Sequence, residues 1–149
     1  MDVHEMLNKK MSDDFSKLTG KVFIEIPPKI FREMDARFIA YERKKSLKVE
    51  FPVKEWYANP MMNMQGGMIA TAFDCVFGPL SYLIAARPVT TLDMSVNYIR
   101  PIPVGETITI EGKLIVRGFS TMNMAAECYD KKGRLMATAT TNMLILNTK

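Results

Sequence analysis

A polar loop that runs into an apolar segment carries the residues of this 149-residue chain that could do chemistry. The loop includes Asn59 and ends at Gly66 and Gly67, and the apolar segment after it contains one carboxylate, Asp74. Backbone N–H groups in the first turn of a helix have no acceptor within the helix, so they can bind negative charge on an oxygen. A carboxylate embedded among apolar residues is costly unless it has a partner or a task. Together these features suggest the two halves of an acyl-transfer site.

Several other kinds of catalytic site are made improbable by what the sequence lacks. The single histidine, His4, lies in a terminal segment that we expect to be mobile, so a Ser-His-Asp triad, a Cys-His pair or a metal site with imidazole ligands is not expected. No phosphate-binding loop or dinucleotide fingerprint occurs. Catalysis must therefore rest on carboxylates, backbone donors, amides and hydroxyls, with no metal and no separate cofactor.

The spacing of Gly66 and Asp74 decides how they could cooperate. Asp74 lies eight residues after Gly66, which is about 12 Å along a helix. One carbonyl group cannot contact both residues of the same chain. If they act together, a two-fold axis must bring Asp74 of one copy beside Gly66 of another. The alternative is structural: glycines that cap a helix, and a carboxylate that bonds a neighbouring loop.

The predicted helix has two different faces. One face combines Gly67 and Asp74 with residues that are mostly small, and it leaves room for a ligand. These residues are Ala70, Thr71, Gly78 and Ser81. The opposite face is bulky and suits packing against a sheet. Its residues are Ile69, Phe73, Val76, Phe77 and Leu80.

Hydrophobic periodicity predicts a single α+β domain over residues 1–149, with residues 1–35 as an N-terminal helical extension. The extension contains helical spacing in residues 1–20 and a short helix at 29–34 after two prolines. Alternating apolar residues predict strands at 37–43, 47–53, 90–98, 106–117, 122–129 and 135–146. The short connections favour antiparallel neighbours. The economical packing is a curved antiparallel sheet of five to six strands wrapped around the long central helix.

Composition indicates which partners and compartment to expect. The net charge is +4, but Lys and Arg are scattered, so no nucleic-acid partner is predicted. Cys75 and Cys128 lie within apolar patterns and suggest buried thiols of a reducing compartment. The N-terminal residues lack the pattern of a signal peptide. The apolar segment 68–86 contains Asp74 and is better explained as a core helix than as a membrane span. We therefore expect a cytoplasmic protein without a membrane partner.

As an ordered set, these motifs resemble the phenylacetic acid degradation type of hotdog-fold acyl-CoA thioesterases over about residues 50–146. The resemblance rests on Asn59, the Gln65-Gly66-Gly67 turn, Asp74, Gly78-Pro79, the segment 90–101, Gly105, the Arg117-Gly118 turn and the turn at 129–133. It implies a hotdog fold that pairs into homodimers, often assembled further into homotetramers, with active sites at the dimer interface. Acyl-CoA is the implied substrate, and coenzyme A enters only as part of it.

The resemblance also implies roles for individual residues. Asp74 is the nucleophile or the general base that activates water, and the N–H of Gly66 polarises the thioester carbonyl. Asn59 helps to hold the water or the thioester, and Thr91 supplies a hydroxyl near the carboxylate. Gln65 replaces a histidine of many members, so we expect it to orient the carbonyl or the loop. Substrate binding is assigned to Gly67, Arg117 and Gly118; basic residues at 131–134 could also meet coenzyme A phosphates.

The sequence leaves three questions open. The chain could be a hotdog module that binds acyl-CoA without hydrolysing it, although the N-terminal residues are too few and too weakly basic for a DNA-binding element. A hydratase or dehydratase of the same fold is less favoured, because such enzymes usually pair a histidine with the acidic residue. Methionines around the motif suit an apolar or aromatic acyl group, or simply fill the core.

Overall fold

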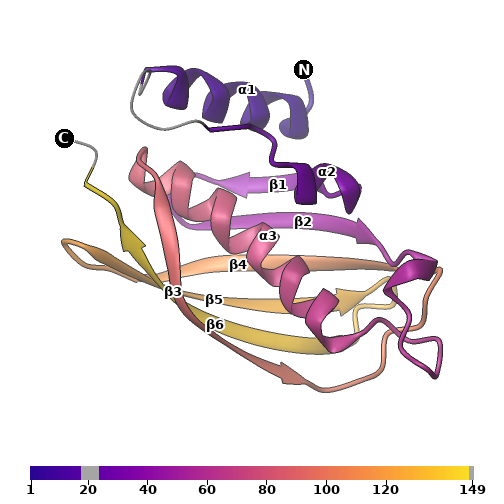
Figure 1. Ribbon diagram of the computed structural model, residues 1–149. Coiled ribbons are helices and arrows are strands. Elements are labelled where there is room, and N and C mark those ends of the chain that lie inside the picture. The colour runs from indigo at the N-terminus through magenta and orange to yellow at the C-terminus, as the bar shows by residue number, and fades with distance from the viewer. Residues whose placement is uncertain (18–23, 148–149) are drawn as a thin grey trace.

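The computed structural model describes residues 1–17 and 24–147, which form a curved antiparallel sheet around one long helix (Figure 1). In chain order the elements are α1 (Val3–Ser16), α2 (Lys29–Glu33), β1 (Arg37–Glu42), β2 (Ser46–Pro52), the 3-10 turn η1 (Glu55–Tyr57), α3 (Gly66–Ala85), β3 (Val89–Tyr98), β4 (Thr107–Arg117), β5 (Thr121–Asp130) and β6 (Leu135–Ile145). The strand order is β1-β2-β4-β5-β6-β3, and every pair is antiparallel. The predicted α+β architecture, with its sheet wrapped around a central helix, is confirmed.

Alternate side chains on the strands are buried under α3, which explains the period-two patterns of the sequence. In β2, for example, Leu47, Val49 and Phe51 are all fully buried. Gly112 of β4 lies directly below the helix, where a Cβ atom would come within 2.9 Å of Val76 Cγ1. The absence of a side chain at this position therefore allows α3 to approach the sheet closely.

The bulky face of α3 is buried as predicted. It consists of Ile69, Phe73, Val76, Phe77 and Leu80. The prediction that Ser81 belongs to the open face with Asp74 is wrong, because Ser81 is fully buried. Its hydroxyl donates to the carbonyl oxygen of Gly78 at 2.6 Å, so the helix itself satisfies the buried polar group.

α3 is also the element that raised the question of a membrane span. By length and composition alone it could cross a bilayer, but 67% of its apolar window is buried inside the protein. The surrounding sheet covers most of this apolar surface (Figure 1). The prediction of a core helix is therefore confirmed.

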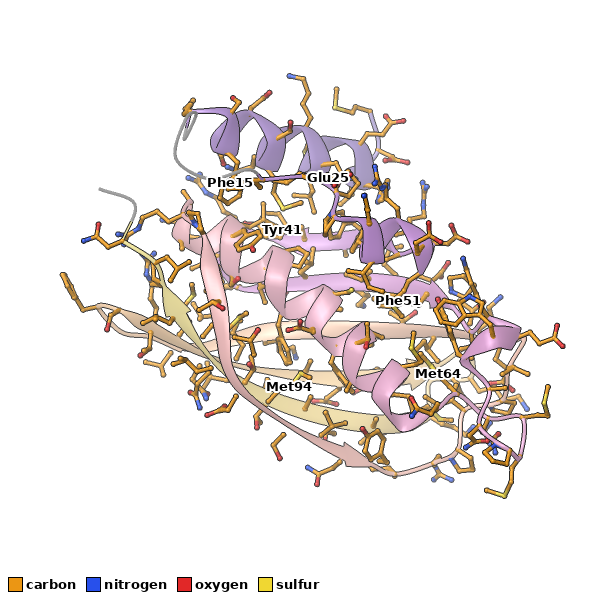
Figure 2. The ribbon with its side chains drawn as sticks, in the orientation of Figure 1. Phe15, Glu25, Tyr41, Phe51, Met64 and Met94 are labelled. Atoms are coloured by element: carbon orange, nitrogen blue, oxygen red, sulfur yellow. The ribbon has the colours of Figure 1, made fainter. Side chains whose placement is uncertain are left out.

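The N-terminal extension covers the end of α3 that lies furthest from the polar loop. Figure 2 shows Phe15 near the C-terminal end of α3, whereas Met64 lies at its start. Leu7, Met11 and Phe15 are the buried residues of α1. The rings of Phe15 and Tyr82 meet edge to face at 5.1 Å, so α1 is packed directly on α3.

His4 lies inside α1 and not in a mobile end, so that expectation was wrong. Its Nδ1 accepts a hydrogen bond from the Phe38 N–H at 3.1 Å, and its ring stacks on Phe31 with centroids 6.3 Å apart. Its Nε2 faces the side-chain amide of Asn8 at 3.3 Å. Both ring nitrogens are therefore engaged, and His4 anchors the extension to β1.

Candidate active site

Asn59 organises the loop between η1 and α3. Its Oδ1 accepts hydrogen bonds from the N–H groups of Met61 and Asn63 at 3.0 and 3.1 Å, and its own N–H donates to the Asn63 carbonyl oxygen at 2.7 Å. The Nδ2 group has no hydrogen-bond partner among the residues that the structure describes. Asn59 thus fixes the loop with its oxygen and keeps a donor for a ligand.

Gln65 is the N-cap residue of α3. Its backbone is extended (φ −61°, ψ 140°), and its Oε1 accepts a hydrogen bond from the Met68 N–H at 3.2 Å. Its N–H donates to the Tyr57 carbonyl oxygen at 2.7 Å, which ties the helix start to the core. A Cβ atom at Gly67 would lie 2.8 Å from Gln65 Oε1, so this cap is compatible only with glycine unless Gln65 shifts.

The N–H groups of Gly66 and Gly67 have no acceptor within the described part of the chain. They therefore form a donor site at the positive end of the α3 dipole. Tyr98, at the end of β3, packs on this helix start: its hydroxyl donates to the Gly66 carbonyl oxygen at 2.8 Å. A Cβ atom at Gly66 would lie 3.3 Å from the tyrosine ring, so glycine accommodates this contact.

Asp74 and Thr91 come together across α3 and β3. The Thr91 hydroxyl donates to Asp74 Oδ1 at 3.1 Å. A register shift between Thr91 and Asp93 marks a bulge in the pairing of β3 with β6, and such bulges change the direction of a side chain. The Asp93 carboxylate accepts hydrogen bonds from the backbone and side chain of Asn142 at 3.2 and 3.1 Å, which fixes the bulge.

The carboxylate of Asp74 is exposed in the single chain, so the expectation that it is embedded among apolar side chains was wrong. Its apolar neighbours in sequence point to the sheet, whereas Asp74 lies on the other face of α3. The helix is continuous from Gly66 to Asp74, so the two groups are about 12 Å apart along its axis. Within one chain, the N–H of Gly66 and the carboxylate of Asp74 are therefore too far apart to contact the same carbonyl group.

A cavity of about 480 Å³ opens beside Asp74. It lies between the N-terminal extension and the C-terminal half of α3, and residues 24–28 and the start of β3 complete its wall. Its volume falls in the range of roughly 300–1,000 Å³ that is typical of small-molecule sites. The arrangement can therefore hold an apolar group next to an exposed carboxylate.

Comparison with known proteins identifies the family. A family model described as the thioesterase superfamily matches residues 62–137, just over half of the chain. A protein of Saccharolobus solfataricus that is provisionally named as an esterase is 31% identical over 121 residues, which cover 80% of this chain and 85% of that protein. The chain belongs to the thioesterase superfamily. It is accordingly a thioester hydrolase.

Solved structures show that this thioesterase has the hotdog fold that its sequence predicted. It is similar to the PaaI protein from the phenylacetic acid degradation operon of Escherichia coli, with a TM-score of 0.78 and 13% identity over 95% of this chain and 96% of that one. A Streptococcus mutans protein solved with acetyl-CoA bound has a TM-score of 0.71 and 22% identity over 87% of this chain and 94% of that one.

The two cysteines of the thioesterase are free and buried, as predicted. Burial, and then the negative charge of Asp74, raises the pKa of the Cys75 thiol to about 12. Burial and Asp130 raise the pKa of Cys128 to about 12 as well. Because the thiolate is the reactive form, neither cysteine is suited to act as a nucleophile. Among the described residues, no three His, Cys, Asp or Glu side chains are placed to hold a metal ion.

Arg117 and Gly118 lie at the other end of the thioesterase from Gly66. The Arg117 guanidinium donates to the Ile84 carbonyl oxygen at 3.3 Å, near the C-terminus of α3, and the Gly118 N–H donates to the Thr121 carbonyl oxygen at 2.8 Å. Ile84 is 18 residues beyond Gly66, or about 27 Å along the helix. Within one chain the structure does not bring these residues to the helix start, and their role in substrate binding stays a prediction.

The basic residues at 131–134 form the turn between β5 and β6. Asp130 holds this turn, because its Oδ1 accepts hydrogen bonds from the N–H groups of Lys132 and Arg134 at 3.0 and 2.9 Å. The Arg134 N–H contributes most to lowering the pKa of Asp130, ahead of the Arg134 side chain. The backbone of the turn is therefore held by Asp130, and contact with coenzyme A phosphates stays a prediction for Lys131 and Lys132.

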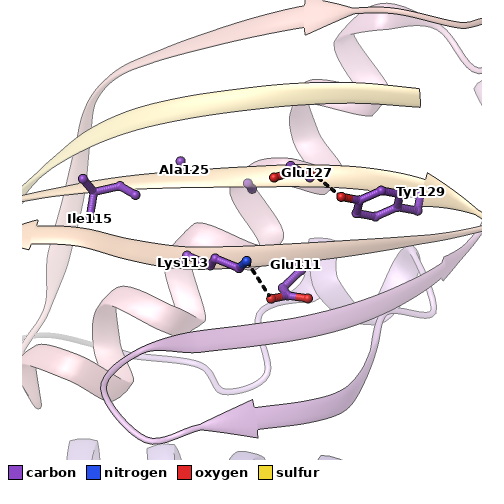
Figure 3. A pocket seen from close by; sticks show the side chains of 7 residues that line it. Glu111, Lys113, Ile115, Ala125, Glu127 and Tyr129 are labelled. Carbon is purple, nitrogen blue, oxygen red and sulfur yellow. Dashed lines mark hydrogen bonds and ion pairs between the residues drawn. The ribbon is translucent and has the colours of Figure 1, made fainter. Parts of the chain in front are cut away.

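A second depression lies on the outer face of the sheet, over β4 and β5 (Figure 3). Its charged groups are paired with each other: Lys113 lies 3.4 Å from Glu111, and the Tyr129 hydroxyl donates to Glu127. Its volume is about 150 Å³. With its polar groups satisfied and little space, this depression is a poorer candidate than the region around Asp74.

Sequence reasoning missed three features of the site. Tyr98 lies within the segment 90–101 but was given no role of its own, and its contact with Gly66 spans 32 positions in the chain. The pairing of Asp93 with Asn142 was signalled only by an acidic residue inside an otherwise apolar and hydroxyl-rich strand. The cavity formed by residues 24–31 and α3 gave no signal beyond the apolar character of that segment.

Proposed function

We propose that this thioesterase hydrolyses acyl-CoA at a site completed by two copies of the chain. Asp74 and Thr91 of one copy face the thioester, and the N–H of Gly66 from a second copy binds its carbonyl oxygen. One observation carries the proposal: a carboxylate held by Thr91, and a helix start whose N–H groups have no acceptor among the described residues, lie on one helix about 12 Å apart. Two antiparallel copies of α3 would place each donor beside the other copy's carboxylate.

The chemistry can follow either of two routes at this site. As a general base, Asp74 accepts a proton from water while the water oxygen bonds to the carbonyl carbon. The C–S bond then breaks, and coenzyme A leaves as a thiolate that takes up a proton. As a nucleophile, Asp74 itself bonds to the carbonyl carbon and expels the thiolate, and water then hydrolyses the anhydride. In both routes the Gly66 N–H stabilises the negative oxygen, a contribution of about 3 kcal/mol.

The remaining site residues support this reaction. Asn59 offers its Nδ2 group to the water or the thioester, and Gln65 holds the start of α3 in place. Gly67 contributes a second backbone donor, and Arg117 and Gly118 of the assembled protein contact the coenzyme A portion. No metal or separate cofactor is needed, because the thiolate is a good leaving group.

The sheet edge favours the proposed dimer. In the described part of the chain, β3 pairs only with β6, so its other edge is open there, and most of its side chains are exposed. An open edge of this kind can pair with the same strand of a second copy. We therefore propose a homodimer through β3, which assembles further into a homotetramer.

We further propose that the enzyme is of the phenylacetic acid degradation type and acts in the cytoplasm. Support for the type comes from the ordered motif set and from the structural similarity to PaaI. Support for the location comes from two free, buried cysteines, which fit a reducing compartment. Acyl-CoA as the ligand is supported by the acetyl-CoA in the Streptococcus mutans structure.

Thiol release from a panel of aryl and straight-chain acyl-CoAs tests the proposal. Asp74→Asn is expected to lower kcat by about 10²- to 10⁴-fold, the usual contribution of a positioned acid–base group. Because Asp74 is exposed, the variant should keep its free energy of unfolding within about 0.5 kcal/mol. Light scattering after size exclusion should show a dimer or tetramer for both proteins. A strict monomer, or full activity of the variant, would refute the shared site.

The alternative is a module that binds acyl-CoA without hydrolysis. The Gly66 N–H, which has no acceptor among the residues described, and the cavity beside Asp74 would serve binding equally well. Calorimetric binding of the same acyl-CoAs separates the two functions. Micromolar affinity with no thiol release over hours would establish the binding module.

A further inference from the structure

The cavity beside Asp74 follows the open face of α3 for two turns. Asp74, Gly78 and Tyr82 all line it, and they are spaced four residues apart along one face of the helix. The distance from Asp74 to Tyr82 along the axis is about 12 Å. The cavity therefore has a polar end at the carboxylate and extends toward the part of α3 that α1 covers.

The wall opposite α3 is largely apolar and comes from the N-terminal extension. It includes Met11 of α1, Ile26 and Pro27 before α2, and Ile30 and Phe31 within α2. Glu25 also lines the cavity, but its carboxylate is paired with the Arg32 guanidinium at 2.6 Å. The edge-to-face contact between Tyr82 and Phe15 supports the far end. Such a wall excludes water and favours an apolar occupant.

Gly78 has no side-chain heavy atom, so it leaves this part of the cavity open. A Cβ atom at this position would meet no heavy atom within 4 Å. Glycine inside a helix is destabilising by roughly 1 kcal/mol relative to alanine, but Pro79 follows it here, and a proline ring crowds the Cβ atom of the residue before it. Glycine at this position relieves that contact, and the bare helix surface that it leaves widens the cavity between the carboxylate and Tyr82.

We propose that this cavity is the acyl-group pocket, that it takes apolar acyl tails up to about 12 Å long, and that Gly78 and Tyr82 set their length. The inference rests on the proposed thioester hydrolysis and adds its substrate class. Because the family match covers residues 62–137, the wall built by the N-terminal extension lies outside the matched region. The pocket therefore combines α3 residues inside the matched region with a wall that the extension supplies.

The test is a series of straight-chain acyl-CoAs from acetyl upward, together with benzoyl- and phenylacetyl-CoA, assayed for kcat/KM. For the wild type, kcat/KM should rise about fourfold for each methylene that becomes buried, and then fall once the tail reaches Tyr82. Gly78→Leu should fill the cavity, so kcat/KM for long tails should fall 10- to 100-fold more than kcat/KM for acetyl-CoA. Tyr82→Ala should move the preferred length toward longer tails.

Controls separate this effect from general damage. Ser12→Leu adds the same side chain to the exposed side of α1, away from the cavity, and should leave the length profile unchanged. Gly78→Ala is the matched control for folding, because its Cβ atom meets the same restriction from Pro79 as that of Gly78→Leu but fills little of the cavity, so its length profile should stay close to that of the wild type. If Tyr82→Ala fails to fold, Tyr82→Leu replaces it with a smaller loss of packing.

The outcomes distinguish the two proposals. If Gly78→Leu lowers kcat/KM for every acyl length by the same factor, the cavity is not the acyl pocket, although hydrolysis stands. If the wild type hydrolyses no CoA ester, the proposed function fails, and calorimetric affinity for the same series becomes the readout. A length-dependent affinity that Gly78→Leu shortens would then still support the pocket, and a uniform affinity would overturn it.

Discussion

The two faces of α3 have opposite tasks. The inward face is bulky and fully enclosed by the sheet, with Phe73, Val76 and Phe77 all at zero exposure. The outward face presents Asp74 in the open, and its only bond among the described residues is the one from Thr91. One helix thus combines a fully buried surface with an exposed carboxylate.

This difference shows how the fold supports the chemistry. Burial of the bulky face against the sheet fixes the rotation of α3 about its axis, and Gly112 lets Val76 approach β4 closely. Once the inward face is fixed, the direction of Asp74 is determined as well. The outward face can then tolerate change in side chains without loss of the fold, so the two faces should respond differently to substitution.

The largest effect is expected from Phe77→Ala on the inward face. Removing a buried phenylalanine leaves a cavity and should lower the free energy of unfolding by about 3–5 kcal/mol. Because Phe77 does not touch the reacting groups, kcat of the folded fraction should stay within about threefold of the wild type. Urea unfolding and initial rates at low temperature measure the two quantities. A loss of kcat without a loss of stability would show that the inward face acts in catalysis and not in folding.

Gly66→Pro tests the donor at the start of the outward face. Proline is tolerated in the first position of a helix, and the extended backbone of Gln65 suits the residue before a proline, but proline has no N–H. We expect kcat to fall about 10²- to 10³-fold, as for other oxyanion donors. Gly66→Ala is the matched control, because it crowds Tyr98 in the same way and keeps the N–H. Equal losses in both variants would remove Gly66 from the mechanism.

The sequence predicted much of the architecture because local patterns encode it. The strand expected at 106–117 is observed as Thr107–Arg117, and the one expected at 122–129 as Thr121–Asp130. Alternating burial on a curved sheet produces that signal directly. The start of α3 was also predictable, because Gln65-Gly66-Gly67 combines a cap with residues that permit a close approach.

The remaining features depend on contacts between distant parts of the chain. The helical spacing placed Ser81 on the open face, but burial is decided by which elements cover that part of α3. The pairing of Asp74 with Thr91 was expected only from the family resemblance, since nothing in the spacing relates the two residues. The contact of Tyr98 with Gly66 and the cavity under the extension depend on how β3 and residues 24–31 cross α3, which no local pattern records.

Thr91→Val tests the hydrogen bond that β3 supplies to the carboxylate on the outward face. Valine has nearly the same shape but cannot donate to Asp74 Oδ1, so the carboxylate loses its one hydrogen bond among the described residues. We expect kcat/KM to fall about tenfold, in line with a hydrogen bond to a charged group. Thr140→Val on the exposed side of β6 is the matched control and should have no effect. If both variants behave alike, Thr91 does not position the carboxylate.

The smallest effect is expected from His4, which anchors the extension that covers the outward face beyond Asp74. Burial, and then the positive charge of Arg37, lowers the pKa of His4, while the carboxylates of Asp2 and Glu5 oppose this shift. Because Nδ1 accepts the Phe38 N–H, protonation of the ring would break that bond. The unfolded chain therefore binds the proton more readily, and stability is full above pH about 6.5 and declines below it.

His4→Gln should remove this decline, so the stability advantage of the wild type should shrink by about 1 kcal/mol between pH 7.5 and 5.5. Urea unfolding at both pH values measures it, and a constant difference would show that α1 is held by packing of Leu7, Met11 and Phe15 alone.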